Sequence, residues 1–238
     1  MSANRNAKQT PVGATAGGFY TVKEAARLLN ISQPSRVTAW LQGRVKTSTG
    51  PVIERQYLPI EAVQELGFLD LLEVRFIDYF RNQGVSLQSL RKAAQTARRE
   101  WKLSHPFATS KAKFLTDRKS IFQATANETH DPVLLNLVSR QFAMYVVLED
   151  LLDRGLTFDL TTGLAQEWHP KPLDFPDIAV NPFVAFGQPT VKPAGVPTSA
   201  ILKIWQAENG NYSAVADWFE IDVDQTKQAI EFELGLPN

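Results

Sequence analysis

Two short amphipathic segments separated by a tight break lie near the start of the sequence, and they constrain the fold more than any other feature. Thr21 is followed three residues later by Glu24, which is the spacing of a capping box at a helix N-terminus. Apolar residues at helical spacing follow and stop at Asn30, and a second apolar face begins near Pro34 and stops at Gly43. The pattern predicts a helix-turn-helix, a motif whose second helix enters the major groove of DNA.

The residues around this motif predict a wing. Ser32 is the expected cap of the second helix, with Pro34 in its first turn. After Gly43, two short segments rich in β-branched and basic residues flank a turn at Gly50, which suits a hairpin. A short helix is expected near Ile60–Leu66.

The next stretch predicts a helical hairpin. One amphipathic helix begins at Phe68 and ends before Gly84, and Ser86 caps a second helix that runs from Leu87 to about Trp101. We expect a homodimer, because one recognition helix on one half-site gives too little specificity, and this hairpin is a candidate for its interface.

The middle of the chain predicts a small α+β segment. The runs KAKFLTD and SIFQATA are expected to be short strands around a turn at residues 117–119. Residues 134–152 are expected to be helical, and a second hairpin is expected to turn at Thr162 and Gly163.

The last part of the chain predicts a helical module after a linker that contains Pro170, Pro172 and Pro176. An irregular loop rich in Pro and Gly precedes three short helices, which are expected at Ser199–Ala207, Ser213–Phe219 and Asp224–Glu233. The expected fold is mainly α with small β elements. Its expected divisions are a disordered tail (1–18), a winged helix-turn-helix (19–66), a helical hairpin (67–103), a small α+β segment (104–170) and a C-terminal three-helix module (171–238).

The net charge of zero conceals two halves of opposite sign. Residues 1–119 hold 19 Lys and Arg against 9 Asp and Glu, whereas residues 120–238 hold 6 against 16. The halves therefore carry +10 and −10, which suggests one polyanionic and one basic partner. Alternatively, the acidic half keeps the protein soluble or folds back onto the basic half.

The sequence contains no cysteine, which excludes disulfides and thiolate zinc sites. No apolar run is long enough to span a bilayer and no signal segment begins the sequence, so we expect a cytoplasmic protein without membrane contact.

The candidate DNA contacts cluster in and around the helix-turn-helix. Basic side chains there can bind phosphates, and the exposed side of the second helix can read base edges. Val37 and Trp40 are expected in the core. The alternative for the basic residues is a solvated surface, and the same choice stays open for the basic run Arg91–Lys102. The phosphate candidates are Arg27, Arg36, Arg44, Lys46 and Arg55, and the base-reading candidates are Gln33, Ser35, Arg36 and Ala39.

No catalytic residue, metal site or cofactor is predicted. His105, His130 and His169 each stand alone in the sequence, without a second ligand at helical spacing. The carboxylates of the acidic half show no pattern that pairs them for catalysis, so a nuclease is the least favoured hypothesis.

Aromatic residues are frequent near the C-terminus. Trp205 and Trp218 fall at core spacing on expected helices, so they are expected to be buried. Phe183 and Phe186 lie in the Pro- and Gly-rich loop, where side chains are harder to bury. We consider these two, with Gln188 and Lys192, as candidate contacts to a partner protein; core packing is the alternative for the two rings.

Two stretches resemble known families. YTVKEAARLLNIS and the Trp-bearing helix after it resemble MerR-type winged helix-turn-helix domains. FIDYFRNQGVSLQSLRKA resembles the helix pair that follows the wing in those regulators, where a GVSL turn joins the helices. This resemblance covers residues 19–101, and one extra residue near Gln33 and Pro34 shifts the base-reading positions relative to the family.

The C-terminal sequence resembles a domain found in VapB-type antitoxins, which are encoded beside toxins with a PIN-like ribonuclease fold. The Gly-Thr-Arg run of that domain is reduced to Ala194 and Gly195, so no role of the missing Thr and Arg is carried over. The matching positions are Asn181-Pro182, Gly187, Pro189, Val191, Gly195, Val196-Pro197-Thr198 and Phe232-Glu233.

The combined resemblance implies an antitoxin that neutralises a PIN-like ribonuclease toxin and represses its own operon by binding operator DNA. The alternative is a MerR-like transcriptional regulator that senses a small ligand through residues 104–238.

Overall fold

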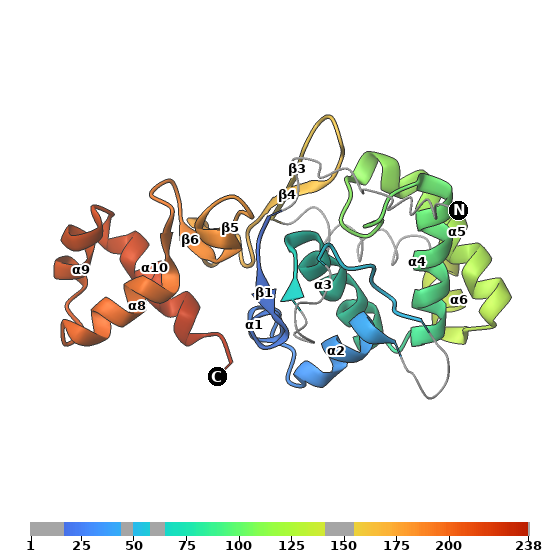
Figure 1. Ribbon diagram of the computed structural model, residues 1–238, viewed down its shortest axis with the longest axis horizontal. Helices are drawn as coiled ribbons and strands as arrows, with labels where there is room; N and C mark the ends of the chain where they lie inside the picture. Colours follow the sequence, from blue (N-terminus) through green and yellow to red (C-terminus); the bar gives the residue numbers. More distant parts are fainter. Residues whose placement is uncertain (1–16, 44–49, 58–64, 141–154, 238) are drawn as a thin grey trace, which may run out of the picture.

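The computed structural model describes residues 17–43, 50–57, 65–140 and 155–237, and within these the side chains of 111–119 are not described. Helices from the N-terminal half form the larger body, three C-terminal helices form the opposite end, and a five-stranded sheet lies between them (Figure 1). The described elements thus form a mainly helical fold with small sheets, as predicted. The helices are α1 (Val22–Leu28), α2 (Pro34–Gln42), α3 (Phe68–Asn82), α4 (Leu87–Trp101), α5 (Lys111–Thr129), α6 (Pro132–Ser139), α8 (Thr198–Ala207), α9 (Tyr212–Phe219) and α10 (Val223–Leu234). The strands are β1 (Tyr20–Thr21), β2 (Glu65–Leu66), β3 (Leu156–Phe158), β4 (Ala165–Trp168), β5 (Ile178–Val180), β6 (Pro189–Val191) and β7 (Val196–Pro197).

The two short helices of the helix-turn-helix are confirmed. The Thr21 side chain accepts from the backbone N–H of Glu24, whose carboxylate accepts from the Thr21 N–H at 2.8 Å, so the capping box is complete. Asn30 takes a left-handed conformation (φ 55°) between α1 and α2, and Gly43 ends α2. The expected cap at Ser32 is wrong, because Gln33 occupies the N-cap position and its side chain makes no capping hydrogen bond.

Residues 50–57, here called the wing arm, contain no strand, so this part of the expected hairpin is not formed. Residues 44–49 and 58–64 lie outside the described part of the chain. A short helix was expected near Ile60–Leu66, but its last two residues, Glu65 and Leu66, instead form strand β2, which pairs with β1. Helix α4 holds the arm instead: Arg91 donates to the Gly50 carbonyl at 2.9 Å and Arg98 to the Val52 carbonyl at 2.7 Å.

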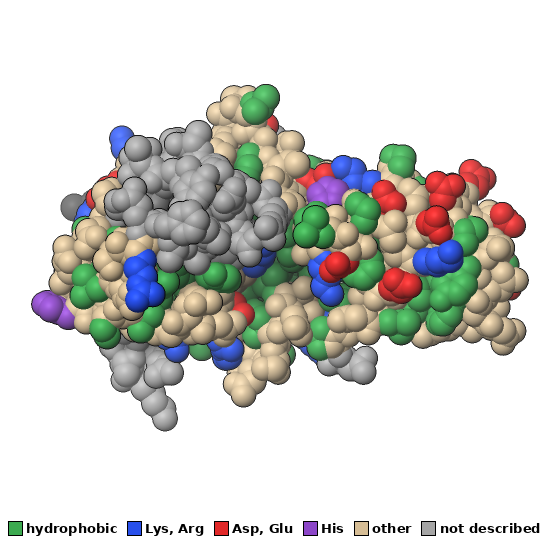
Figure 2. All heavy atoms as spheres, turned by 180° about the vertical axis from the view of Figure 1, so that it is seen from behind, with side chains coloured by type: hydrophobic (Ala, Val, Ile, Leu, Met, Phe, Trp, Pro, Cys, Tyr) green, Lys and Arg blue, Asp and Glu red, His purple; other side chains and the backbone are tan. Residues whose placement is uncertain are grey.

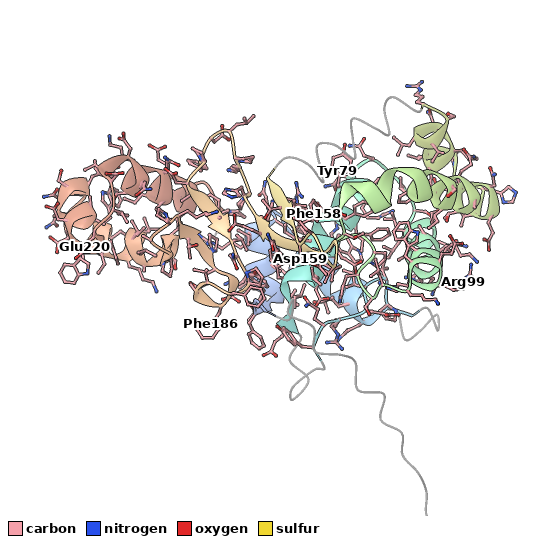
Figure 3. All side chains as sticks on the ribbon, turned by 90° about the horizontal axis from the view of Figure 1, so that it is seen from above. Tyr79, Arg99, Phe158, Asp159, Phe186 and Glu220 are labelled. Carbon is pink, nitrogen blue, oxygen red and sulfur yellow. The ribbon has the colours of Figure 1, made fainter. Side chains whose placement is uncertain are left out.

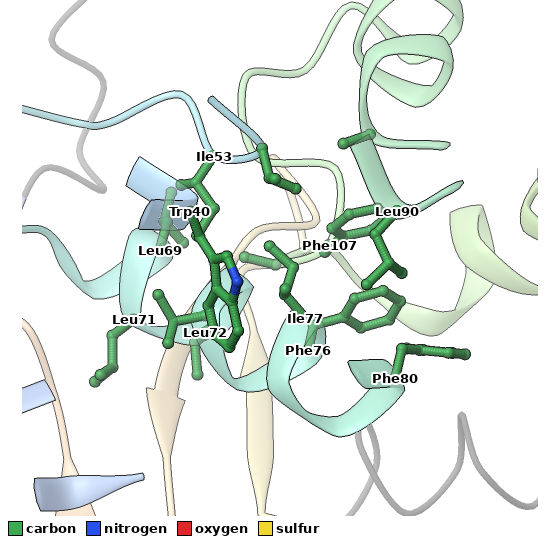
Figure 4. Close-up of a cluster of buried hydrophobic side chains, with 14 of the residues drawn as sticks. Trp40, Ile53, Leu69, Leu71, Leu72, Phe76, Ile77, Phe80, Leu90 and Phe107 are labelled. Carbon is green, nitrogen blue, oxygen red and sulfur yellow. The ribbon is translucent and has the colours of Figure 1, made fainter. Parts of the chain in front are cut away.

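The helical hairpin is confirmed and forms the centre of the larger core. Ser86 caps α4 by accepting from the Ser89 N–H at 3.1 Å. Helix α3 is buried along most of its length. Aromatic rings from α3, α5 and the loop after α4 stack together, and the ring centres of Phe76 and Phe107 are 4.2 Å apart (Figure 4). The apolar faces of α3 and α4 are buried in the larger core of the same chain, so a dimer interface at this hairpin would have to use the polar faces of the two helices.

The expected strands at KAKFLTD and SIFQATA are wrong, because residues 111–129 form the single helix α5. Ile121, Phe122, Thr125 and Ala126 are buried at helical spacing against the larger core, which outweighs the weak turn signal at residues 117–119. Helix α6 ends at Ser139, and residues 141–152 of the longer expected helix lie outside the described part.

The hairpin at Thr162 and Gly163 is confirmed as β3 and β4, but the sheet continues after the proline-containing linker, where an irregular loop was expected. Strands β5, β6 and β7 extend it in sequence order. On β5, Ile178 packs in the smaller C-terminal core and Val180 in the larger core. Helices α8, α9 and α10 confirm the three expected C-terminal helices.

The last two residues of the expected disordered tail, Gly17 and Gly18, make backbone hydrogen bonds to the folded chain. The Gly17 carbonyl accepts from the Phe68 N–H at 3.1 Å, and the Gly18 N–H donates to the Pro182 carbonyl at 3.0 Å. Residues 1–16 of that expected tail lie outside the described part.

Candidate DNA and partner interfaces

Helix α2 presents the candidate base-reading residues on one side. Gln33 and Ser35 are exposed and Ala39 is half-buried, whereas Val37 and Trp40 are buried in the larger core. The expected division of α2 into a core face and an outer face is therefore present.

Arg36 is the one basic residue of α2. Its guanidinium lies 3.1 Å from the Asp78 carboxylate of α3 and 5.3 Å from the centre of the Trp40 ring. About a third of its side chain remains exposed. These contacts hold the guanidinium at the surface beside the exposed side of α2.

The other two basic candidates that the structure describes, Arg27 and Arg55, lie on different elements. Arg27 on α1 lies 2.9 Å from the buried carboxylate of Glu233 on α10, which also accepts a 2.6 Å hydrogen bond from the Thr198 hydroxyl. Arg55 is half-buried on the wing arm, and Arg44 and Lys46 lie outside the described residues. Arg27 therefore joins the N-terminal helices to the C-terminal module, a contact that local sequence could not indicate.

The candidate partner contacts Phe183 and Phe186 lie on one loop, residues 181–188, here called the partner loop. Phe183 is 63% exposed and Phe186 is 81% exposed, so neither packs in the core. Figure 3 shows Phe186 at the edge of the ribbon, pointing away from it. Ala185 and Phe186 both take left-handed conformations (φ 46° and 57°), which are costly for residues with a β-carbon. The loop thus keeps two large apolar rings in water on a strained backbone.

Gln188 and Lys192 differ in their contacts. Gln188 is exposed at the end of the partner loop, whereas the Lys192 ammonium lies 2.6 Å from the Glu167 carboxylate of β4. Burial by itself would raise the pKa of Glu167, but hydrogen bonds from Lys192, Asn181 and His169 outweigh it and lower the pKa below its usual range. Lys192 therefore helps to fasten the sheet to the loop after β6.

Two exposed aromatic residues were missed by sequence reasoning. Trp218 was expected in the core but is 67% exposed on α9, because the buried side of this helix carries Val215, which packs in the smaller core, and Ala216. Phe19 is 47% exposed, and its backbone lies against the partner loop. No local signal marks Phe19, since the partner loop that its backbone contacts is more than 160 positions away in the chain.

His105 stands alone in the sequence, but the fold places it between two carboxylates of α3. Its Nδ1 lies 3.5 Å from the Asp70 carboxylate and 3.6 Å from the Glu73 carboxylate, all buried, and Arg98 lies 3.6 Å from Glu73. His169 is also paired, 3.1 Å from Glu167. Across the described residues, no group of three or more His, Cys, Asp or Glu is arranged to hold a metal ion.

The two ends of the molecule differ in charge. Figure 2 shows Asp and Glu side chains gathered over the end that the C-terminal helices form. Residues 155–237 hold eleven Asp and Glu against four Lys. This end is therefore electrostatically suited to a basic partner rather than to a nucleic acid. None of the described helices combines the length and the apolar character that crossing a membrane requires.

Comparison with known proteins gives relatives but no family model, since none matches the chain. The chain is 23% identical over 230 residues to the protein named "Putative antitoxin VapB45" of Mycobacterium tuberculosis, a match that covers 90% of this chain and 92% of that protein. It is also similar to the crystal structure of Rv2018 from Mycobacterium tuberculosis, with a TM-score of 0.66 and 20% identity over 89% of this chain and 96% of that one. The chain therefore shares the fold of Rv2018 over most of its length.

Proposed function

We propose that this chain is the antitoxin of a bacterial type II toxin-antitoxin system. It binds and neutralises a PIN-like ribonuclease toxin in the cytoplasm, and it represses its own operon by sequence-specific binding to operator DNA. The observation that carries this proposal is the similarity to a protein named as an antitoxin over nine-tenths of both chains. On this proposal the chain is a binding protein, not an enzyme.

The toxin surface is assigned to the partner loop. Phe183 and Phe186 together form an exposed aromatic surface on the acidic half of the chain, and exposed rings of this kind supply much of the binding energy at protein interfaces. The surrounding negative charge favours the capture of a basic protein. Gln188 and Lys192 lie at the margin of this surface, where Lys192 would have to exchange Glu167 for the toxin.

The test of the toxin role is co-expression with the protein encoded by the neighbouring gene. We expect that protein to stop growth when it is expressed alone, to be harmless with this chain, and to co-purify with it. The variant Phe186→Ser should lose both effects, whereas Leu173→Ser, at an equally exposed leucine outside the partner loop, should keep them. A harmless neighbour that does not co-purify would contradict the antitoxin proposal and favour the ligand-sensing regulator.

The operator role is assigned to α2 and its neighbours. Gln33, Ser35, Arg36 and Ala39 would contact base edges, and Arg27, Arg44, Lys46 and Arg55 would contact phosphates. Two copies of α2 in a homodimer would read two half-sites.

The test of the operator role is binding to DNA from upstream of the chain's own gene. Affinity should fall steeply as salt is added, and Arg36→Ala should weaken it by about 1–3 kcal/mol if Arg36 reads a base edge. Lys203→Ala removes an exposed charge from α8 and should leave the affinity unchanged. Equal binding by both variants would exclude α2 as the reading helix.

A further inference from the structure

Three exposed phenylalanines lie at one place on the surface, although they come from opposite ends of the chain. The Gly18 N–H donates to the Pro182 carbonyl at 3.0 Å, and the Phe19 N–H donates to the Phe186 carbonyl at 3.0 Å. Phe19 is therefore joined by its backbone to the loop that carries the other two rings, Phe183 and Phe186. All three keep roughly half or more of their surface in water.

The contact between this segment and the partner loop is close. The Tyr20 hydroxyl donates to the Gly187 carbonyl at 2.7 Å, in a buried position. A β-carbon on Gly187 would clash with that hydroxyl and would lie 2.8 Å from the Gly18 α-carbon. Only a glycine leaves room for this approach, so the partner loop and residues 17–20 are closely packed at Gly187.

The other side of the same segment contacts the wing arm. The Tyr57 hydroxyl donates to the Gly18 carbonyl at 3.0 Å, and the rings of Phe19 and Tyr57 have centres 5.7 Å apart. The preceding residue of the arm, Gln56, donates its N–H to the Asp70 carboxylate at 3.0 Å. Residues 17–20 therefore lie between the partner loop and the wing arm and contact both.

We infer that Phe19 completes the partner-binding surface, and that residues 17–20 couple binding at this surface to the position of the wing arm. The inference rests on the proposed function and specifies how its two activities are linked. The occupant is a basic protein with an apolar groove, because two of the three rings, Phe183 and Phe186, belong to the acidic half of the chain, and all three are exposed rather than enclosed in a pocket.

The coupling has a simple physical origin. A partner that covers Phe19 restrains its ring and backbone, and this restrains the hydroxyl and ring contacts of Tyr57. Any effect of the partner on DNA affinity must be matched by an equal effect of DNA on partner affinity, with factors typically about 5–150-fold.

The first experiment measures the affinity of the full chain for the protein encoded by the neighbouring gene. Phe19→Ala should weaken binding by about tenfold or more, as Phe186→Ala should, and Leu173→Ala should not. Phe19→Leu, which keeps most of the apolar area, should recover part of the loss, and equal thermal stabilities would show that the variants fold.

The outcomes separate this inference from the proposed function. If the wild-type chain does not bind the neighbouring protein, the antitoxin proposal fails and this inference fails with it. If the wild type binds and Phe19→Ala binds equally well, only the inference is overturned. It is also overturned if Phe19→Ala changes self-association while partner binding is kept, because the rings then meet a second copy of the chain.

The second experiment measures coupling through Tyr57. The ratio of DNA affinities with and without the neighbouring protein should differ from one by about fivefold or more in the wild type. Tyr57→Phe keeps the ring but removes the hydroxyl that donates to Gly18, so this ratio should move towards one while partner affinity stays unchanged. Hydrogen exchange of the free protein should also be faster at the Gly18 and Phe19 amides in this variant. An unchanged ratio with unchanged exchange would overturn the coupling.

Discussion

Among single residues, the buried charges around His105 have the clearest consequence. Asp70 accepts from the N–H groups of Gln56 and Gly67, and Glu73 accepts from that of Phe107, so the carboxylates hold the wing arm and the loop after α4. Burial raises the pKa of Asp70 to about 6, although His105 and the two N–H donors work against it. Burial alone would lower the pKa of His105, but Glu73 and Asp70 outweigh it and raise the pKa above its usual value.

These shifts predict that the free energy of unfolding falls as the pH rises from about 4 to 7. A carboxyl with a raised folded-state pKa holds its proton more tightly when folded, so this contribution to stability is lost as the pH passes about 6. His105 acts in the same direction, because the stability from its raised pKa is lost as the pH passes that pKa. The fall should be about 1–3 kcal/mol in urea unfolding.

Two variants test the assignment to Asp70. Asp70→Asn does not titrate, so its unfolding free energy should vary less with pH than that of the wild type. Asp174→Asn, at an exposed carboxylate, should keep the wild-type slope. A wild-type stability that rises across this range would contradict the assignment.

Among the secondary-structure elements, Asp131 joins two helix starts. Its carboxylate accepts from the N–H groups of Val133 and Leu134 at the start of α6, and from the N–H of Ser86 and the hydroxyl of Ser89 at the start of α4. One side chain therefore fixes the angle at which α6 meets the helical hairpin.

We expect Asp131→Ala to destabilise the fold by about 2–4 kcal/mol, since it removes both a cap and charge-assisted hydrogen bonds. Burial by itself would raise the pKa of Asp131, but hydrogen bonds from Leu134, Ser86 and Ser89 lower it below its usual range. The contribution is therefore present above about pH 4 and lost as the pH falls further. Asn211→Ala removes a single capping bond on α9 and should cost only about 1 kcal/mol in the same denaturation assay. Equal losses would show that the bridge to α4 contributes nothing.

The elements predictable from sequence were those with local start and stop signals. The capping box at Thr21, the cap at Ser86 and the turn at Gly163 each specify their element within a few residues. Helix α5 and strands β5 to β7 carry no such signals, since burial and pairing with distant residues decide their conformation. For the same reason the local sequence was enough to identify Phe183 and Phe186 as candidates, whereas it could not show that Phe19 lies beside their loop.

In the whole molecule, the ion pair between Arg27 and Glu233 is one of the ties between the two ends. Glu233 is almost fully buried, and the Thr198 hydroxyl and Arg27 occupy its two oxygens. A carboxylate that stays buried after losing its cation strongly destabilises the folded state. The pair therefore favours one arrangement of the C-terminal helices against α1.

Arg27→Glu should open this arrangement, because it places a second carboxylate beside Glu233. The radius of gyration measured by small-angle X-ray scattering should increase, and the cost should be about 1–3 kcal/mol because Arg27 is partly exposed. Lys23→Glu makes the same charge change at an exposed position of the same helix and should leave the radius unchanged. An equal radius in all three proteins would show that the pair does not hold the ends together.

Strand β5 has a consequence for how this protein can evolve. Ile178 and Val180, two positions apart, fill different cores, while β4 meets β5 in register only at Trp168 and Val180. The proline-rich segment before β5 resembles a domain linker, but recombination there would exchange Val180, a residue of the larger core, together with the C-terminal half. The new half could be accommodated only if it supplied an apolar side chain of similar volume at that position. The two halves are therefore expected to be inherited together, and to change partners by substitution rather than by exchange.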